Sequence, residues 1–435
     1  MRVGVALSIG WGLVAGLACE LPPSAAAPTV AYLDDPAYAR AELTASLVNP
    51  SNGYSALRLA HYATGDAADW ERLPAWNPAA APIAAGELDA PGGAPPAALP
   101  ASAAPLALPA SVSSPDDPAL LALGEAAFAR YPAQLAPYLS VALTSRAAAA
   151  RYGLWVDPAR GVGGLVRARM GDGSVAVALT CSSCHAVAGA DGAIAPGVPN
   201  ATLDIGAAIL AAQGIPAALS QDPHAAWGPG RLDVTTATGT EPARIPDLRP
   251  VSFLTYLQQD ATVRARDLTT LAIRVETLLI TSWGEAIRPP RVVALALAAY
   301  VQSLGASLPP SADASAASPN GAALFQQSCA ACHAPPALTG EPVPLAVVGT
   351  DPLLGLSADR GTGTYRVPSL HGVGTRGPLL HDGTLPSLDA MFDPARLTEV
   401  FAQRLHGLGA VPGHGYGLNF SDQQRQDLLT YLHAL

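Results

Sequence analysis

The sequence predicts an all-α fold built from two similar halves, with long irregular loops and an N-terminal arm rich in Ala and Pro. Apolar residues recur at i, i+3 and i+4 in residues 292–304 and in the C-terminal segment, which is the spacing of a buried helix face. No long alternation of apolar and polar residues suggests a sheet. Short blocks that recur in the same order divide the chain into its two halves.

Residues 1–18 are typical of a signal peptide. A positively charged start precedes an apolar run that is too short to be a spanning helix of the mature protein. Residues 16–19 (GLAC) resemble a bacterial lipobox, in which Cys19 is lipidated, although Gly stands where Leu or Val is usual. Because Glu20 replaces the Asp that signals inner-membrane retention, we expect a periplasmic lipoprotein held at the outer membrane. Secretion without an anchor is the alternative.

Residues 19–113 are expected to form an arm and a linker. Aromatic residues between positions 31 and 82 predict an arm that packs on the domains. The following stretch, residues 79–115, is rich in Ala, Pro and Gly and reads as a loosely packed linker. Helical signals begin after Ser114, a residue type that caps helix N-termini.

The two halves share several matched segments. These are residues 124–128 (GEAAF) with 321–325 (GAALF), 245–248 (IPDL) with 367–370 (VPSL), 259–261 (QDA) with 381–383 (HDG), and closing helices that carry Tyr300 and Tyr431. We therefore expect one domain at residues 114–304 and another at residues 320–435, joined by a linker at 305–319. The first domain has an insertion of roughly fifty residues after its entry helix.

Each half contains one C-x-x-C-H sequence, at residues 181–185 and 329–333. This is the attachment sequence of c-type haem: two cysteines bond the porphyrin vinyl groups and the histidine binds the iron. The fifth cysteine is Cys19, so no pair remains for a disulfide. A zinc site made from all four motif cysteines is the competing interpretation, but it leaves both histidines unexplained. The cofactor residues are Cys181, Cys184, His185, Cys329, Cys332 and His333, and each half is predicted to be a cytochrome c unit.

The overall charge argues against one class of partner. A net charge of -10 and a pI near 5.3 lack the basic footprint that nucleic-acid binding needs. An acidic surface is compatible with a basic redox partner protein.

Three segments of the second half are residues 365–370 (YRVPSL), 376–383 (RGPLLHDG) and 385–388 (LPSL). Together they resemble the second domain of the di-haem cytochrome c peroxidase/MauG superfamily. Residues 413–422 look more like its branch related to rubber oxygenases. The resemblance implies two all-α cytochrome c domains with facing haem edges. One iron would be six-coordinate and relay electrons, and the other would meet peroxide or dioxygen. A calcium ion is often found between such domains, but no compact carboxylate cluster marks a site here.

For the second haem, the resemblance implies that His333 is the proximal ligand. His414, in a Gly-His-x-Tyr-Gly segment, is the favoured ligand on the other face. Met391 is an alternative, although the peroxidases use a Met nearer position 395. His381, a positioned neighbour of the haem in the family, is another alternative.

For the first haem, His185 is the expected proximal ligand. Counting seventeen residues back from the closing-helix tyrosine reaches His414 in the second half but Trp283 in the first. His381 likewise corresponds to Gln259. This comparison favours a first iron whose sixth site is open or water-bound. His224 is the main alternative ligand and otherwise a loop histidine, and Met170 is a poorer candidate.

Two departures from the family bear on function. Gln259 stands where the family has a tryptophan that bridges the haems, unless Trp227 or Trp283 replaces it. Glu276 is a candidate for the carboxylate that moves a proton during peroxide cleavage, with a helix-surface carboxylate as the alternative. We expect electron transfer between two covalently bound haems. The alternatives are a peroxidase- or oxygenase-like enzyme acting at the first haem, and a partner-bound redox subunit or sensor.

Overall fold

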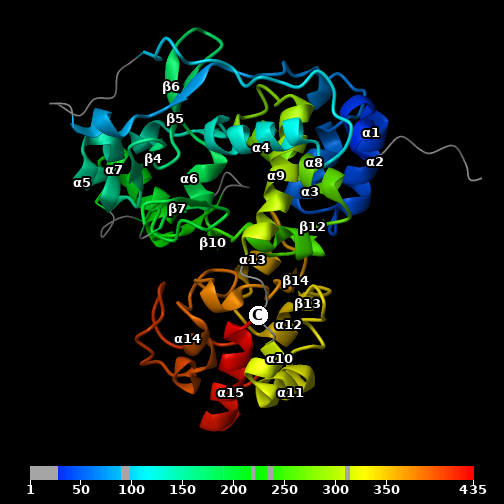
Figure 1. Cartoon of the computed structure of the whole chain (residues 1–435), viewed down its shortest axis with the longest axis vertical. Coiled ribbons are helices and arrows are strands. Elements are labelled where there is room, and N and C mark those ends of the chain that lie inside the picture. The colour runs from blue at the N-terminus through cyan, green and yellow to red at the C-terminus, as the bar shows by residue number, and fades with distance from the viewer. Residues whose placement is uncertain (1–27, 90–97, 190, 217–220, 234–238, 309–313) are drawn as a thin grey trace, which may run out of the picture.

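The structure is a computed structural model that describes residues 28–89, 98–189, 191–216, 221–233, 239–308 and 314–435. The predicted signal peptide and Cys19 lie outside these residues. We call residues 28–308 the first lobe and residues 314–435 the second lobe. Figure 1 shows the second lobe, coloured yellow to red, below the first.

The prediction of an all-α fold is wrong. The residues that the structure describes are mixed α/β, with 42% helix and 12% strand. An antiparallel four-stranded sheet in the first lobe has the order β1-β5-β6-β2. Its strands are β1 (Ala80–Pro82), β2 (Gln134–Leu135), β5 (Val166–Arg169) and β6 (Val175–Leu179). Antiparallel pairs join β3 (Val156–Asp157) to β4 (Gly161–Val162), β7 (Ala186–Ala188) to β8 (Ile194–Pro196), β9 (Arg231–Leu232) to β10 (Ala243–Arg244), β11 (Tyr256–Leu257) to β12 (Val263–Arg264), and β13 (Val343–Pro344) to β14 (Thr364–Tyr365).

The insertion of the first half supplies most of the four-stranded sheet. β5 and β6 form a hairpin whose turn contains Gly173 at φ 84°, a conformation that glycine adopts without a steric penalty. The arm supplies β1, which pairs with β5 from a stretch that the sequence marked as a linker. The sheet therefore consists of short strands drawn from segments far apart in the chain.

Helices make up the rest of the regular structure. In the arm they are α1 (Pro28–Asp34), α2 (Pro36–Ser46) and α3 (Gly53–His61). The first lobe continues with α4 (Pro118–Arg130), α5 (Arg146–Arg151), α6 (Cys181–His185), α7 (Ile205–Ala212), α8 (Leu268–Ser282) and α9 (Arg291–Ser303). The second lobe has α10 (Ala314–Ala317), α11 (Pro319–Ser328), α12 (Leu345–Val348), α13 (Leu353–Leu356), α14 (Leu388–Phe392) and α15 (Asp422–His433).

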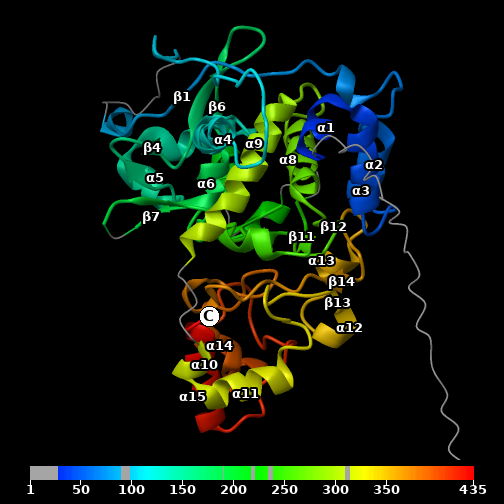
Figure 2. The same cartoon turned by 45° about the vertical axis from the view of Figure 1, so that its right-hand side comes forward.

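The arm packs on the first lobe through a shared hydrophobic core. Buried Tyr32, Tyr62 and Trp70 of the arm belong to the same core as Ile273 of α8 and Leu297 of α9. The arm helices lie beside α8 in both views (Figure 1 and Figure 2). A second core fills the insertion, and a third lies between α11, α14 and α15 in the second lobe.

The sequence repeat corresponds to equivalent helix contacts. A Cβ added at Gly124 of α4 would lie 2.1 Å from the carbonyl oxygen of Ala296, and one at Gly321 of α11 would lie 2.1 Å from that of Asp427. Each pair of helices therefore crosses with backbones in contact, which only glycine permits. One turn later, Phe128 packs on Tyr300 with ring centroids 5.3 Å apart, and Phe325 packs on Tyr431 at 5.2 Å.

The proposed domain boundaries remain predictions. Of the predicted linker 305–319, residues 309–313 lie outside the described residues, and α10 forms within the remainder. Among the residues described, we find no helix whose length and hydropathy would let it span a bilayer.

Candidate functional site

The second C-x-x-C-H segment begins where α11 ends. Cys329 is the C-cap of this helix, and the backbone N–H groups of Cys332 and His333 both donate to its carbonyl, at 3.1 and 2.9 Å. The Nδ1 atom of His333 lies 3.1 Å from the carbonyl oxygen of Pro368 and 3.2 Å from that of Leu338. Because a carbonyl only accepts, Nδ1 carries the proton and Nε2 is left as the metal-binding nitrogen.

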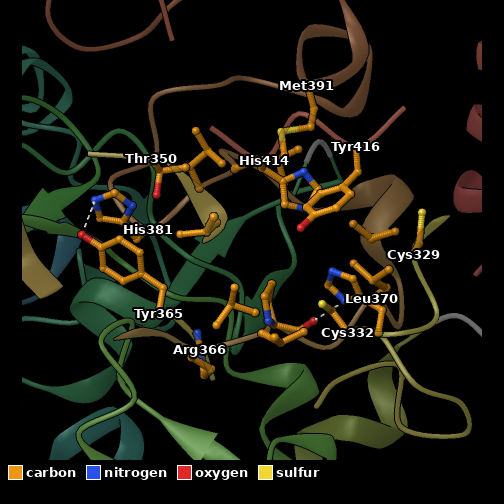
Figure 3. A pocket seen from close by; sticks show the side chains of 18 of the residues that line it. Cys329, Cys332, Thr350, Tyr365, Arg366, Leu370, His381, Met391, His414 and Tyr416 are labelled. Atoms are coloured by element: carbon orange, nitrogen blue, oxygen red, sulfur yellow. Dashed lines mark hydrogen bonds between the residues drawn. The ribbon is translucent and has the colours of Figure 1, made fainter. Parts of the chain in front are cut away.

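His414 faces His333 across a cavity. Their ring centroids are 6.4 Å apart with an interplanar angle of 64°, and Figure 3 shows His414 above Cys332. Two imidazoles bound at about 2 Å on opposite sides of one metal ion have ring centroids roughly 6 Å apart. The separation therefore suits an iron ligated by both rings.

The His414 loop is held by one buried arginine. His414 has φ 41°, a left-handed conformation that costs a non-glycine residue about 1–3 kcal/mol. The Nη2 atom of Arg396 donates to the carbonyls of Gly413 and His414 at 2.8 and 2.9 Å, and its Nε donates to the carbonyl of Met391 at 2.8 Å. These bonds fix the loop and aim the imidazole. Its Nδ1 atom is sealed from solvent without a hydrogen-bond partner in the described part of the chain.

The residues that line the cavity between the two histidines suit a porphyrin. The cavity measures about 1300 Å³, a volume that includes the open solvent at its mouth. Both thiols and His333 line it, together with mostly apolar side chains that include Val343, Leu370, Leu388 and Phe392. The donor set of two thiols, one imidazole beside them and another opposite is that of a six-coordinate c-type haem.

The other two candidate ligands of the second iron also line this cavity. Met391 is buried, and in Figure 3 its side chain descends towards His414. His381 lies at the other end of the cavity, stacked on Tyr365 at 4.2 Å, with its Nε2 atom 3.3 Å from the tyrosine hydroxyl. His414 is thus the candidate that the structure brings opposite His333, while His381 faces away from the thiols.

The first C-x-x-C-H segment forms the one-turn helix α6, directly after β6. The Nδ1 atom of His185 lies 3.0 Å from the carbonyl oxygen of Pro246, which is the repeat equivalent of Pro368. Both proximal histidines therefore have the same tautomer, because each Nδ1 atom lies against the carbonyl of the equivalent proline. Burial also raises the pKa of the Cys181 and Cys184 thiols to about 12.

Burial also keeps the candidate ligands neutral. It lowers the pKa of His185 to about 4, and it lowers the pKa of His414 to about 4 with help from His333. A neutral imidazole is the form that binds a metal.

The distal residues predicted for the first lobe are not brought to His185. Trp283 donates its indole N–H to the carbonyl of Pro132 at 3.2 Å, and Gln259 lines the cavity of the second lobe. His224 has its Nδ1 atom 2.5 Å from the Asp222 carboxylate and its ring against Trp227 at 4.7 Å. Within the described residues, no recorded contact places an imidazole opposite His185.

Glu276 is fully buried on α8 and is engaged by the arm. Its Oε2 atom accepts hydrogen bonds from the hydroxyls of Tyr32 at 2.8 Å and Tyr62 at 2.7 Å. Its Oε1 atom lies 3.5 Å from Nε of Arg291. These contacts give Glu276 a structural role, and its catalytic role stays a prediction with no recorded contact to the first motif.

Sequence reasoning missed three arginines of the cavity wall, Arg244, Arg366 and Arg376. Arg244 and Arg366 stand directly before the matched IPDL and VPSL segments, so a longer comparison of the halves would have paired them. The described residues contain no group of three or more His, Cys, Asp and Glu side chains that could hold a separate metal ion.

Comparison with known proteins does not assign this chain to a family. No family model matches the chain, and no curated protein matches it. It is similar to a solved structure described as a MauG-like protein associated with microbial copper homeostasis. The identity is 16%, the TM-score is 0.32, and the match covers 49% of this chain and 79% of that one. So distant a likeness carries no argument about family or activity.

Proposed function

We propose that this protein is an exported di-haem c-type cytochrome that transfers electrons between two covalently bound haems. The observation that carries the proposal is the pairing of His333 and His414, 6.4 Å apart, across a cavity lined by Cys329 and Cys332. A haem bound there supplies a one-electron ferric/ferrous couple.

The chain itself would hold, orient and shield this cofactor. Cys329 and Cys332 would attach it, and the Pro368 carbonyl fixes the tautomer of His333. Arg396 aims His414 from the opposite side. His333 and His414 would hold the iron from opposite faces, an arrangement that would suit electron relay. His185, Cys181 and Cys184 would hold the first haem in the same way.

An enzymatic role at the first haem is the second candidate. It is favoured by Trp283 and Gln259, which occupy the repeat positions of His414 and His381 and are engaged elsewhere. An iron ligated by His185 alone would offer peroxide or dioxygen a free position. In either role we propose a periplasmic location, a lipid anchor at Cys19, a redox partner protein, and no nucleic-acid partner.

Haem counting tests the proposal. The purified full-length protein should contain two haems per chain by pyridine haemochrome assay and mass. Cys181→Ala/Cys184→Ala and Cys329→Ala/Cys332→Ala should each retain one. A protein that carries bound zinc and no haem would show the proposal to be wrong. Cyanide binding at one haem of the wild type would favour the enzymatic candidate over the relay.

A further inference from the structure

Several residues that line the second-lobe cavity have polar atoms without a hydrogen-bond partner. The cavity-lining atoms that are sealed from solvent and lack a hydrogen-bond partner in the described part of the chain are Nε of Arg244, Nε2 of Gln259, Oγ1 of Thr350, Nε of Arg366, Nε and Nη1 of Arg376, and Nδ1 of His414. Each such atom costs about 1–3 kcal/mol if nothing binds it. All the arginine and glutamine atoms among them are N–H donors, so the cavity calls for a ligand that brings acceptors.

Three of these residues, Arg244, Arg366 and Arg376, bring positive charge to the cavity. Burial lowers the pKa of Arg366 to about 9 and that of Arg376 to about 10, with neighbouring arginines adding to the shift, and both groups stay charged near pH 7. Asp247, Asp260 and Asp382 act on these arginines, and burial still lowers the arginine pKa values. Each of these carboxylates is shared with another partner: Asp247 pairs with Arg249 at 2.6 Å, Asp260 lies 3.8 Å from Arg360, and Asp382 accepts from Thr384. Buried cations are unfavourable unless they are paired and hydrogen-bonded, so the ligand should be anionic.

Backbone contacts hold these arginines in place from both lobes. The backbone N–H of Arg244, in the first lobe, donates to the carbonyl of His381 at 3.1 Å. The backbone N–H of Arg366 donates to the carbonyl of Gln259 at 2.9 Å. The Nη2 atom of Arg376 donates to the carbonyl of Ser369 at 2.6 Å. The Nη2 atom of Arg366 also donates to Oε1 of Gln259 at 3.3 Å. The backbones of Arg244 and Arg366 and the guanidinium groups of Arg366 and Arg376 are therefore held before any ligand binds, which lowers the entropic cost of binding.

We propose that Arg244, Arg366 and Arg376 form a carboxylate-binding wall for the two propionate groups of the second-lobe haem. The guanidinium fork matches a carboxylate with paired, charge-assisted hydrogen bonds. Because Arg244 belongs to the first lobe, the second-lobe cofactor is held by both lobes. This inference rests on the proposed function, since it takes the porphyrin as the occupant of the cavity.

A pair of porphyrin probes separates carboxylate recognition from porphyrin binding. The full-length Cys329→Ala/Cys332→Ala protein, which keeps its first haem, is titrated with ferric protoporphyrin IX and with its dimethyl ester. We expect the free acid to bind about tenfold more tightly or better, as one lost charge-assisted contact implies. Arg366→Gln and Arg376→Gln should reduce this preference, and Arg425→Gln, a second-lobe arginine on α15 outside the cavity lining, should keep it.

Equal affinities for the acid and the ester would overturn the carboxylate-binding wall and leave the proposed function intact. A wild-type protein without haem at Cys329 and Cys332 would overturn both. The intact holoprotein gives a second measurement that does not depend on the cysteine variant. The propionate bending band in its resonance Raman spectrum should shift in Arg366→Gln and Arg376→Gln and stay unchanged in Arg425→Gln. An unshifted band in both cavity variants contradicts the inference.

Discussion

Arg244 and Arg366 make the same hydrogen bond in opposite directions across the boundary between the lobes. The backbone N–H of Arg244 donates to the carbonyl of His381, and that of Arg366 donates to the carbonyl of Gln259. The two arginines are repeat equivalents, as are His381 and Gln259. The two contacts are thus related by a local pseudo-twofold axis. In each of them the arginine lies two residues before the proline whose carbonyl faces the proximal histidine, Pro246 or Pro368.

The loops that accept these bonds have the same backbone shape. Gln258 and Ala261 have φ 64° and 56°, and the equivalent Leu380 and Gly383 have φ 68° and 71°. In the first loop the hydroxyl of Thr262 donates to Asp260 at 2.7 Å, and in the second Thr384 donates to Asp382. The repeat therefore extends beyond the helices to the irregular segments that form the lobe interface.

His414→Ala should convert the second haem from low-spin to high-spin, because the iron loses one of its two imidazoles. The ferric absorption spectrum measures this change. An unchanged spectrum in His414→Ala together with an altered one in Met391→Ala would reverse the axial assignment.

Arg396→Ala should produce a weaker version of the same spectral change. Arg396 holds the carbonyls of Gly413 and His414, so its loss frees the loop and lowers the fraction of ligated His414 without removing the ligand. Unfolding in guanidinium should also show a loss of about 2 kcal/mol or more, since several buried carbonyls lose their donor. Arg425→Ala is the control, and a fully low-spin second haem in Arg396→Ala would argue against the positioning role.

Gly124→Ala and Gly321→Ala should each destabilise the protein by about 1–3 kcal/mol, as overpacked sites do. An alanine is normally favoured over glycine inside a helix, but here its Cβ would meet a backbone carbonyl at 2.1 Å. Gly171→Ala, where a Cβ would meet nothing within 4 Å, is the matched control. Denaturant unfolding measures all three, and a gain in stability at position 124 or 321 would contradict the close helix crossing.

Glu276→Gln should lower the free energy of unfolding by about 1–3 kcal/mol, because Tyr32 and Tyr62 lose the carboxylate that they share as an acceptor in the core, and Arg291 loses the carboxylate 3.5 Å from its Nε atom. The spectrum of the first haem, and any peroxide turnover with a reduced donor, should stay as in the wild type. Glu125→Gln, at an exposed site on α4, is the control. Lost turnover with unchanged stability would favour the catalytic role over the structural one.

The sequence was informative where chemistry requires particular residues. The C-x-x-C-H segments and the entry-helix glycines can be read directly, since only cysteine forms the thioether bonds to haem and only glycine permits the close approach of the helices. His414 was likewise predicted from its Gly-His-x-Tyr-Gly segment.

The sheet and the arginine wall could not be found in this way. β2 has two residues and β6 has five, too few to show an alternating pattern. β1 comes from a stretch of Ala and Pro whose pairing with β5 depends on the tertiary fold. Arg244 and Arg366 stand beside the matched IPDL and VPSL segments, but the sequence does not show that both line one cavity, because this depends on how the two lobes meet.

The most direct test of the account is the ferric spectrum of full-length Cys181→Ala/Cys184→Ala, which isolates the second haem. We predict one covalently bound haem per chain, low-spin at neutral pH and unchanged by added cyanide, because His333 and His414 occupy both faces of the iron. A high-spin or cyanide-binding haem in this variant would contradict the account.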